Sequence, residues 1–83
     1  MRIVAFTAAA ALDLDRLAVQ DREAVPQGLT ELAVTRLGNV KRLSGRAEFQ
    51  LRIRQFRVIF AEDRTTILAL YIGRRETTTY RRR

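Results

Sequence analysis

The sequence contains no cysteine and no histidine. Without cysteine the chain can form neither disulfides nor thiolate metal sites, which fits a reducing compartment. Histidine is the usual general base near neutral pH, so any proton transfer falls to Tyr, Glu, Asp, Lys or Arg. Acidic residues are also few, with 9 against 16 Lys and Arg. The composition therefore excludes disulfide-stabilised folds and histidine-dependent mechanisms.

The chain also lacks a long apolar run, and no segment is long enough to span a membrane. Residues 1–12 open with Met-Arg and continue with mostly apolar residues, a pattern shared with short signal peptides. The run is short, however, and Asp13 and Asp15 follow it at once. Because its removal would take a strand and part of a helix from a small chain, we expect it to belong to the mature, cytoplasmic protein.

The net charge of +7 is unevenly distributed. Residues 1–40 hold four arginines against five acids, whereas residues 41–83 hold twelve basic residues against four acids. Fifteen of the sixteen basic residues are arginine, the side chain suited to bidentate phosphate contacts. This predicts a polyanionic partner, either nucleic acid, the ribosome or an acidic protein. A membrane surface is disfavoured, because the basic residues fall on strands and a tail rather than on an amphipathic helix.

The length of 83 residues predicts a single domain over residues 1–83, with a modest core. Residues 2–6 are expected to form a first strand. A helix over about residues 8–18 follows, with Thr7 as its N-cap, because a threonine hydroxyl can accept a hydrogen bond from a first-turn amide. The apolar stripe of this helix comprises Ala10, Leu14, Leu17 and Ala18.

A second helix is expected from about residue 22 or 25 to residue 36, ended by Gly38 and Asn39. Pro26 suits the first turn of a helix better than its middle, and this favours the later start. Gly28 weakens the helix further. Its apolar stripe has three-and-four spacing and comprises Val25, Leu29, Leu32 and Ala33.

The segment 49–60, F-Q-L-R-I-R-Q-F-R-V-I-F, alternates with period two on either side of Arg54-Gln55. This pattern predicts two strands with one buried face, joined by a two-residue loop. The resulting register pairs Ile53 with Phe56, Leu51 with Val58 and Phe49 with Phe60. The same register places Arg52 directly across from Arg57 on the opposite face.

Three antiparallel strands are expected over about residues 48–54, 56–62 and 65–72, preceded by an exposed basic linker at 40–46. A second turn at Asp63-Arg64 pairs Phe60 with Ile67, Val58 with Ala69 and Phe56 with Tyr71. Tyr71 is therefore expected in the core. Gly73 is expected to break the last strand, leaving residues 74–83 as a basic tail.

Like charges directly opposed on a sheet cost stability, so the opposition of Arg52 and Arg57 favours an anion between them, with phosphate the first candidate. Arg74 and Arg75 come just past the last strand, and Tyr80 follows. An arginine cluster can hold a scissile phosphate and stabilise the charge of its transition state. A positive field favours the phenolate form of a tyrosine, which can take a proton from a ribose 2′-hydroxyl or help position its attack. Together these residues suit RNA phosphate chemistry.

Several segments in order resemble the RelE branch of the RelE/ParE superfamily, the toxins of type II toxin–antitoxin systems. The segments are the strand–Phe6-Thr7–helix opening, G-N-V-K-R-L-S-G at 38–45, L-R-I-R-Q-F-R-V-I-F at 51–60 and Y-I-G-R-R-E-T-T-T-Y at 71–80. The resemblance implies an α+β fold in which two N-terminal helices pack on one face of a small antiparallel sheet, in the order β-α-α-β-β-β. It also implies ribosome-dependent mRNA cleavage in the A site, by 2′-hydroxyl attack that gives a 2′,3′-cyclic phosphate.

The resemblance assigns catalytic roles to four residues. Arg57 matches the family arginine after the aromatic residue of the second long strand, and Arg75 matches the arginine after the glycine of the last strand. Tyr80 matches the tyrosine near the C-terminus, as base or orienting group. Arg52 stands where the family often has a lysine or arginine. Gln50 stands where active members can have another lysine, which points to weaker catalysis.

Further RNA or phosphate contacts are expected from basic and polar side chains on the strands and the linker. This set comprises Lys41, Arg42, Gln50, Arg52, Arg54 and Arg74. An exposed arginine is more often simply solvated, and this is the simpler interpretation for Arg46, Arg54 and Arg64. Residues 81–83 are expected to act as an electrostatic footprint rather than as a site.

The expected partners are the ribosome, mRNA and a cognate antitoxin that is acidic and partly disordered until it folds on contact. Operator DNA is expected only through the antitoxin complex. No cofactor is expected, and no His, Asp or Glu cluster has the spacing of metal ligands. Two alternatives stay open: a non-enzymatic ParE-type toxin that inhibits DNA gyrase, and a catalytically weak member that binds ribosomes or RNA.

Overall fold

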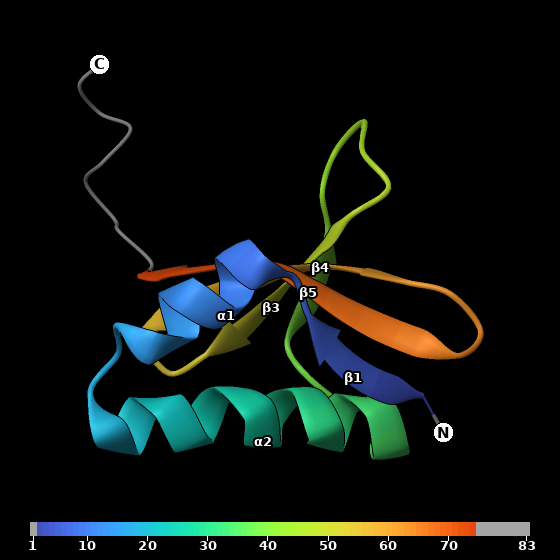
Figure 1. Ribbon diagram of the computed structural model, residues 1–83. Helices are drawn as coiled ribbons and strands as arrows, with labels where there is room; N and C mark the ends of the chain where they lie inside the picture. The colour runs from blue at the N-terminus through green and yellow to red at the C-terminus, as the bar shows by residue number, and fades with distance from the viewer. Residues whose placement is uncertain (1, 75–83) are drawn as a thin grey trace.

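The computed structural model describes residues 2–74. Within them two helices pack against one five-stranded sheet (Figure 1). The elements are β1 (Ile3–Phe6), α1 (Ala8–Asp15), α2 (Val19–Thr35), β2 (Val40–Arg42), β3 (Phe49–Ile53), β4 (Phe56–Glu62) and β5 (Thr66–Arg74). The predicted α+β class, with two N-terminal helices on one face of a small sheet, is confirmed. The sheet was expected to be antiparallel with four strands, whereas it has a fifth strand, β2, and a parallel β1–β5 pair.

The sheet has the strand order β1-β5-β4-β3-β2, so β5 lies between β1 and β4. β1 runs parallel to β5, with Ile3 opposite Thr66 and Phe6 opposite Ala69. The other pairs are antiparallel. The first and last strands of the described chain are therefore neighbours, with β1 at one edge of the sheet and β5 next to it.

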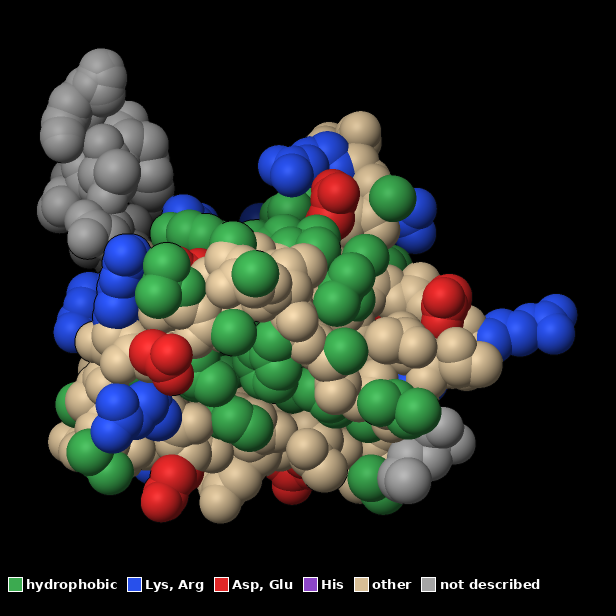
Figure 2. Space-filling model, in the orientation of Figure 1, with side chains coloured by type: hydrophobic (Ala, Val, Ile, Leu, Met, Phe, Trp, Pro, Cys, Tyr) green, Lys and Arg blue, Asp and Glu red, His purple; other side chains and the backbone are tan. Residues whose placement is uncertain are grey.

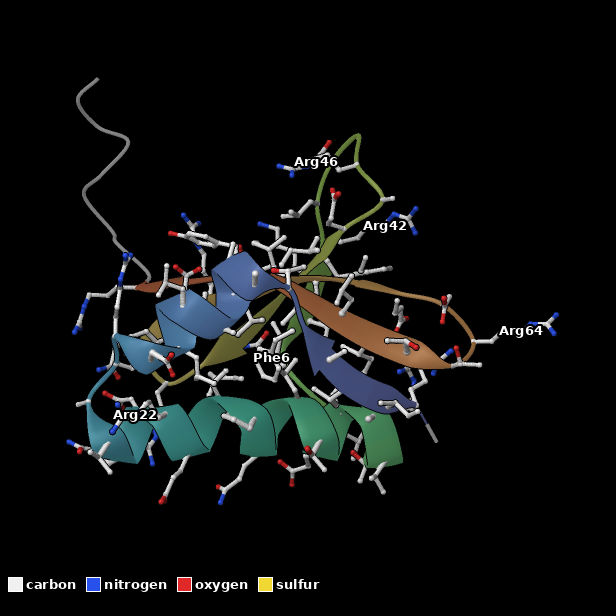
Figure 3. The ribbon with its side chains drawn as sticks, in the orientation of Figure 1. Phe6, Arg22, Arg42, Arg46 and Arg64 are labelled. Carbon is white, nitrogen blue, oxygen red and sulfur yellow. The ribbon has the colours of Figure 1, made fainter. Side chains whose placement is uncertain are left out.

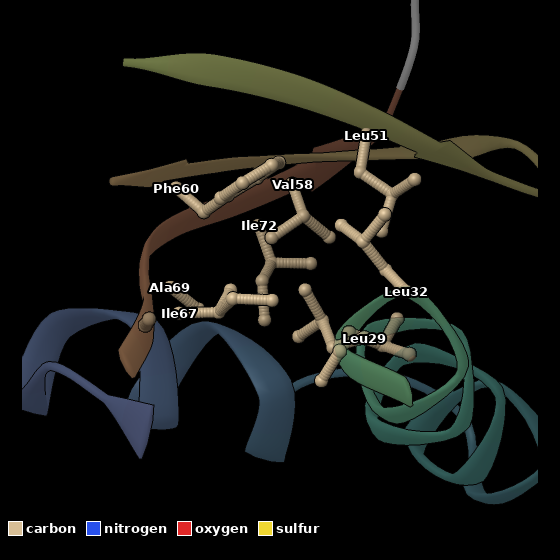
Figure 4. Packing of buried hydrophobic residues seen from close by; sticks show 11 residues of the cluster. Leu29, Leu32, Leu51, Val58, Phe60, Ile67, Ala69 and Ile72 are labelled. Carbon is tan, nitrogen blue, oxygen red and sulfur yellow. The ribbon is translucent and has the colours of Figure 1, made fainter. Parts of the chain in front are cut away.

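The core lies between the helices and one face of the sheet, which we call the covered face (Figure 4). Its buried residues are Ala10, Val25, Leu29, Leu32, Ala33, Leu51, Val58, Phe60, Ile67, Ala69 and Ile72. Phe49 stacks on Phe60 with ring centroids 5.5 Å apart, and Phe6 packs against the same cluster (Figure 3). The predicted stripe of α2 is confirmed, because all four of its residues are buried. Seen in the orientation of Figure 1, charged side chains lie around the margin of the molecule and apolar ones toward its middle (Figure 2).

The predicted cap of α1 is confirmed, since the Ala10 amide donates to Thr7 Oγ1 at 3.1 Å. The predicted boundaries of both helices were less accurate. α1 ends at Asp15, and α2 already begins at Val19, so Pro26 lies inside the helix rather than in its first turn. Pro26 removes one backbone donor from α2, and the tertiary packing of the stripe tolerates that loss.

The C-terminal end of α2 also differs from the expected one. The helix stops at Thr35, and Arg36 takes the left-handed conformation with φ of 63°, before Gly38 and Asn39. Gly28 has a packing role beyond its effect on helix propensity. A Cβ there would lie 2.7 Å from Cδ1 of Ile53, so the glycine lets α2 approach β3 closely.

The predicted register of the β3–β4 hairpin is confirmed in full. Ile53 pairs with Phe56 across the Arg54-Gln55 turn, and Arg52 pairs with Arg57. Arg54 supplies the positive φ of the turn, at 55°. The period-two pattern therefore predicted both the pairing and the face of each side chain in this hairpin.

The predicted register of the β4–β5 hairpin was wrong. Phe60 pairs with Ala69 rather than Ile67, and a β-bulge between Ile59 and Phe60 leaves Leu70 as an extra residue in β5. An extra residue reverses which face the following side chains occupy. Tyr71 therefore leaves the core and is 45% exposed, whereas Ile72 enters the core.

Two further expectations about this part of the chain are corrected. β5 continues through Gly73 to Arg74, so the glycine does not break the strand. In the expected linker at 40–46, Val40–Arg42 form the edge strand β2, with Lys41 opposite Gln50. All three residues of β2 are exposed, as predicted for the linker.

Neither helix of the described chain is both long and apolar enough to cross a membrane.

Candidate functional site

The face of the sheet opposite the covered face carries the candidate site, and we call it the open face. Its side chains follow from the strand registers. The central ones are Lys41, Gln50, Arg52, Arg57, Ile59, Leu68, Tyr71 and Gly73, and none of them is buried. The open face thus joins basic side chains from three strands around a partly exposed apolar centre.

Arg52 and Arg57 lie on this face as a directly opposed cross-strand pair, one residue pair away from the Arg54-Gln55 turn. Both arginines are exposed. Neither makes an ion pair with any carboxylate in the part of the chain that the structure describes. The repulsion between the two guanidinium groups is therefore not relieved by an acid from residues 2–74, and the pair can receive an anion from outside.

Two more of the predicted contact residues lie on the same face. Gln50 precedes Arg52 by two positions in β3, so their side chains share the open face. Lys41 of β2 pairs with Gln50 and extends the basic surface by one strand. The register thus brings Lys41, Gln50, Arg52 and Arg57 onto one face, although Lys41 was expected on a linker. Their contacts with RNA remain a prediction.

Tyr71 is a member of the open face that sequence reasoning placed in the core. It pairs with Ile59, and Gly73, two residues on, pairs with Arg57. A Cβ at Gly73 would lie 2.7 Å from Cε2 of Tyr71 and closer still to its hydroxyl end. The phenol therefore lies across Gly73 and points along β5 toward the position opposite Arg57. An aromatic residue two positions before a glycine was the one sequence signal for this arrangement.

Three predicted contact residues lie elsewhere. The guanidinium of Arg42 lies 5.4 Å from the centre of the Phe49 ring, and that of Arg74 lies 5.5 Å from the Phe56 ring. Both aromatic rings belong to the covered-face side of the sheet. Arg54 forms an ion pair with Asp21 of α2, with Nη1 3.3 Å from Oδ1. The structure does not bring these three arginines to the Arg52–Arg57 pair.

The arginines expected to be simply solvated lie at the margins. Arg46 and Arg64 project from the β2–β3 and β4–β5 connections, away from the helices (Figure 3). Arg46 pairs with Glu48 at 3.0 Å on its own loop. Arg75, Tyr80 and residues 81–83 lie outside the described residues, so their assigned roles remain predictions.

Acidic side chains are engaged at a distance from the open-face arginines. Glu62 receives two hydrogen bonds from Arg36, at 3.1 and 3.2 Å. Asp63 accepts from the amides of Thr65 and Thr66 at 2.9 Å each, and these hydrogen bonds lower the pKa of its carboxyl. Among residues 2–74, no three metal-ligating side chains cluster together. The described part of the site is therefore cationic and phenolic.

A scan against family models and a search of curated proteins found no match to this sequence. Solved structures do match. The toxin–antitoxin complex RelBE2 from Mycobacterium tuberculosis is 26% identical, covers 89% of this chain and 98% of its own, and has a TM-score of 0.72. The chromosomal ParDE system from P. aeruginosa is 21% identical, with coverages of 92% and 98% and a TM-score of 0.75.

An archaeal RelE–RelB complex from Pyrococcus horikoshii matches at 16% identity, with coverages of 92% and 97% and a TM-score of 0.76. The similarity thus extends over nearly the whole length of both the RelE and the ParE representatives. The ParDE and archaeal RelE–RelB matches show a shared fold. Together with the 26% identity to RelBE2 over nearly the whole of both chains, they place the chain in the RelE/ParE superfamily.

Proposed function

We propose that this protein is the toxin of a type II toxin–antitoxin pair and that it cleaves mRNA on the ribosome. The observation that carries the proposal is the Arg52–Arg57 pair, two opposed cations on an open sheet face with no carboxylate partner in residues 2–74. The sequence resemblance to the RelE branch supports the choice of mRNA as substrate. The similar structures come from toxin–antitoxin complexes, which supports the antitoxin partner.

The proposed reaction is an internal transesterification of RNA. The ribose 2′-oxygen attacks the adjacent phosphorus, the bond from phosphorus to the 5′-oxygen breaks, and the products are a 2′,3′-cyclic phosphate and a 5′-hydroxyl. Negative charge grows on the non-bridging oxygens in the transition state. Arg57, supported by Arg52, stabilises that charge by charge-assisted hydrogen bonds. This accounts for a site that is built from guanidinium groups.

Arg75 and Tyr80 complete the proposed site. Arg75 is the second cation on the phosphate, and Tyr80 either accepts the proton from the 2′-hydroxyl as its phenolate or orients the attack as a phenol. The proton is finally returned to the leaving 5′-oxygen. Lys41 and Gln50 flank the reacting phosphate and contact neighbouring parts of the RNA backbone.

The partners follow from charge as well as from resemblance. The net charge of +7 attracts ribosomal RNA and mRNA in the cytoplasm. It also attracts an acidic antitoxin that is partly disordered when free and folds on contact. Contact with operator DNA takes place through the toxin–antitoxin complex.

Primer extension on translated mRNA after induction of the protein tests the proposal. Wild type should give cleavage phased with codons, and Arg57→Ala should reduce it on the order of a hundred-fold or more, as expected for the loss of one transition-state donor. Arg75→Ala and Tyr80→Phe should also reduce it. Arg64→Ala is the matched control, because Arg64 projects from the β4–β5 tip and should leave cleavage unchanged. Equal cleavage by Arg57→Ala and wild type would exclude the proposed role.

One observation supports a second candidate, inhibition of DNA gyrase by a ParE-type toxin. The ParDE structure fits this chain with a TM-score of 0.75, as well as the RelE structures do. Toxicity with intact mRNA and an induced SOS response would favour this candidate. A catalytically weak nuclease is a third outcome. Because Gln50 lies between Lys41 and Ile59 on the open face, Gln50→Lys would add a cation there and should then increase cleavage.

A further inference from the structure

Aromatic rings are unequally divided between the two faces of the sheet. The four phenylalanines, Phe6, Phe49, Phe56 and Phe60, lie on the covered face. Among residues 2–74, Tyr71 is the one aromatic residue on the open face, and it is 45% exposed. A large ring left half in solvent beside opposed arginines requires an explanation beyond core packing.

The backbone places this ring by a specific irregularity. Without the bulge at Leu70, the alternation of β5 would direct Tyr71 into the core and Ile72 outward. With it, the Tyr71 side chain extends over Gly73, whose missing Cβ leaves the necessary space. Gly73 lies opposite Arg57, so the ring is held one strand away from the arginine pair.

We propose that the Tyr71 ring stacks on a base of the single-stranded RNA whose phosphate is held by Arg52 and Arg57. This inference rests on the proposed function and identifies the side chain that orients the RNA at the site. Neighbouring strands are about 5 Å apart, and a base is joined to its phosphate through a single ribose. A nucleotide can therefore place its phosphate at the arginine pair and its base on the Tyr71 ring of the adjacent strand. Stacking accepts every base, because every base has a π-face.

A purely structural role for the ring makes a different prediction. Aromatic side chains also cover glycines in sheets, and this packing requires no ligand. Tyr71→Leu separates the two roles, since leucine covers Gly73 but offers no π-face. A structural ring gives equal RNA affinity in wild type and Tyr71→Leu, whereas a stacking ring does not.

The test uses the full chain with Tyr80→Phe, which removes the proposed base for cleavage. Because the sequence has two tyrosines and no tryptophan, this variant reports the fluorescence of Tyr71 alone. Titration with a single-stranded RNA hexamer should quench that fluorescence. Labelled-RNA anisotropy should show affinity lower by about ten- to a hundred-fold for Tyr71→Leu and Tyr71→Ala. Tyr71→Phe should bind as the parent does.

Gly73→Ala provides an independent variant that keeps the phenol but displaces it from its place. It should lower RNA affinity, and the effect should vanish in the Tyr71→Leu background. Urea unfolding of each variant checks that the chain is folded. Unchanged Tyr71 fluorescence at saturating RNA would overturn the proposal.

The outcomes separate this inference from the proposed function. If Arg57→Ala weakens RNA binding while Tyr71→Leu does not, stacking is excluded and the nuclease site stands. If Tyr71→Phe loses as much affinity as Tyr71→Leu, the contact is made by the hydroxyl and stacking is again excluded. If neither Arg57→Ala nor Tyr71→Leu changes the affinity, the open face does not bind RNA, and the proposed function fails with the inference.

Discussion

The arginines on the two sides of the sheet differ in whether they have a partner within the described chain. On the covered-face side, Arg36 pairs with Glu62, Arg54 pairs with Asp21, and Arg42 and Arg74 lie over phenylalanine rings. On the open face, Arg52 and Arg57 oppose each other without a carboxylate partner among the described residues. An arginine with an internal partner contributes to the fold, whereas an arginine without one is available to a ligand. Position relative to the helices thus separates the two kinds better than the sequence can.

The largest expected effect tests whether the faces differ in packing. Phe60→Ala should lower the free energy of unfolding by about 3–5 kcal/mol, because Phe60 is 1% exposed and central to the core. Ile59→Ala is the matched control, since Ile59 is the adjacent residue on the open face. It should cost about 1 kcal/mol. Urea denaturation measures both, and equal losses would show that the two faces are packed alike.

The sequence predicted the strand register correctly where the alternation of polar and apolar residues indicated which face of the sheet is buried. In the β3–β4 hairpin, polar and apolar residues alternate on both sides of a two-residue turn, over 49–53 and 56–58, so the opposition of Arg52 and Arg57 followed. In β5, residues 67–72 are nearly all apolar, and such a run does not say which side chains face the core. The bulge at Leu70 has no signature in such a run, and the position of Tyr71 was missed for that reason.

Two other incorrect predictions concern the start of α2 and the turn before β5. Pro26 favoured a late start for α2, yet the packing of the apolar stripe outweighed the lost backbone donor. The turn before β5 depends on Asp63, whose side chain binds two following amides, and this lengthened the connection beyond the expected two residues. Both features depend on tertiary or side-chain contacts that residue periodicity does not report.

A smaller effect tests the comparison of the arginines directly. Arg36→Gln should destabilise the fold by about 0.5 kcal/mol, because it removes the partly exposed ion pair with Glu62. Arg57→Gln should stabilise it by a few tenths of a kcal/mol, because it relieves a like-charge opposition. Thermal unfolding in low salt measures the two changes, and both should shrink in 1 M salt. A loss of stability in Arg57→Gln would mean that Arg57 contributes to the fold.

The smallest effect concerns Asp63, whose carboxylate accepts hydrogen bonds from backbone amides of its own turn. Hydrogen bonds from the Thr65 and Thr66 amides lower the pKa of Asp63 below its ordinary value of 3.8. A carboxyl whose pKa is lowered in the folded state stabilises the fold at pH values above its unfolded pKa. That stability is lost as the pH falls through the pKa of the folded state. Asp63→Asn keeps the turn but cannot titrate. Relative to this variant, wild type should lose stability below about pH 3.8 in acid denaturation; parallel curves would contradict the assignment.

The position of β5 between β1 and β4 has a consequence for how the chain acquires its structure. β1 is synthesised first, yet its one neighbour in the sheet is β5, more than sixty positions later. Until residues 66–74 have emerged, the amides of β1 have no strand to bond and the core lacks Ile67, Ala69 and Ile72. The earlier segments therefore cannot mature as a separate unit, and the assembly of the whole sheet waits for its final described strand.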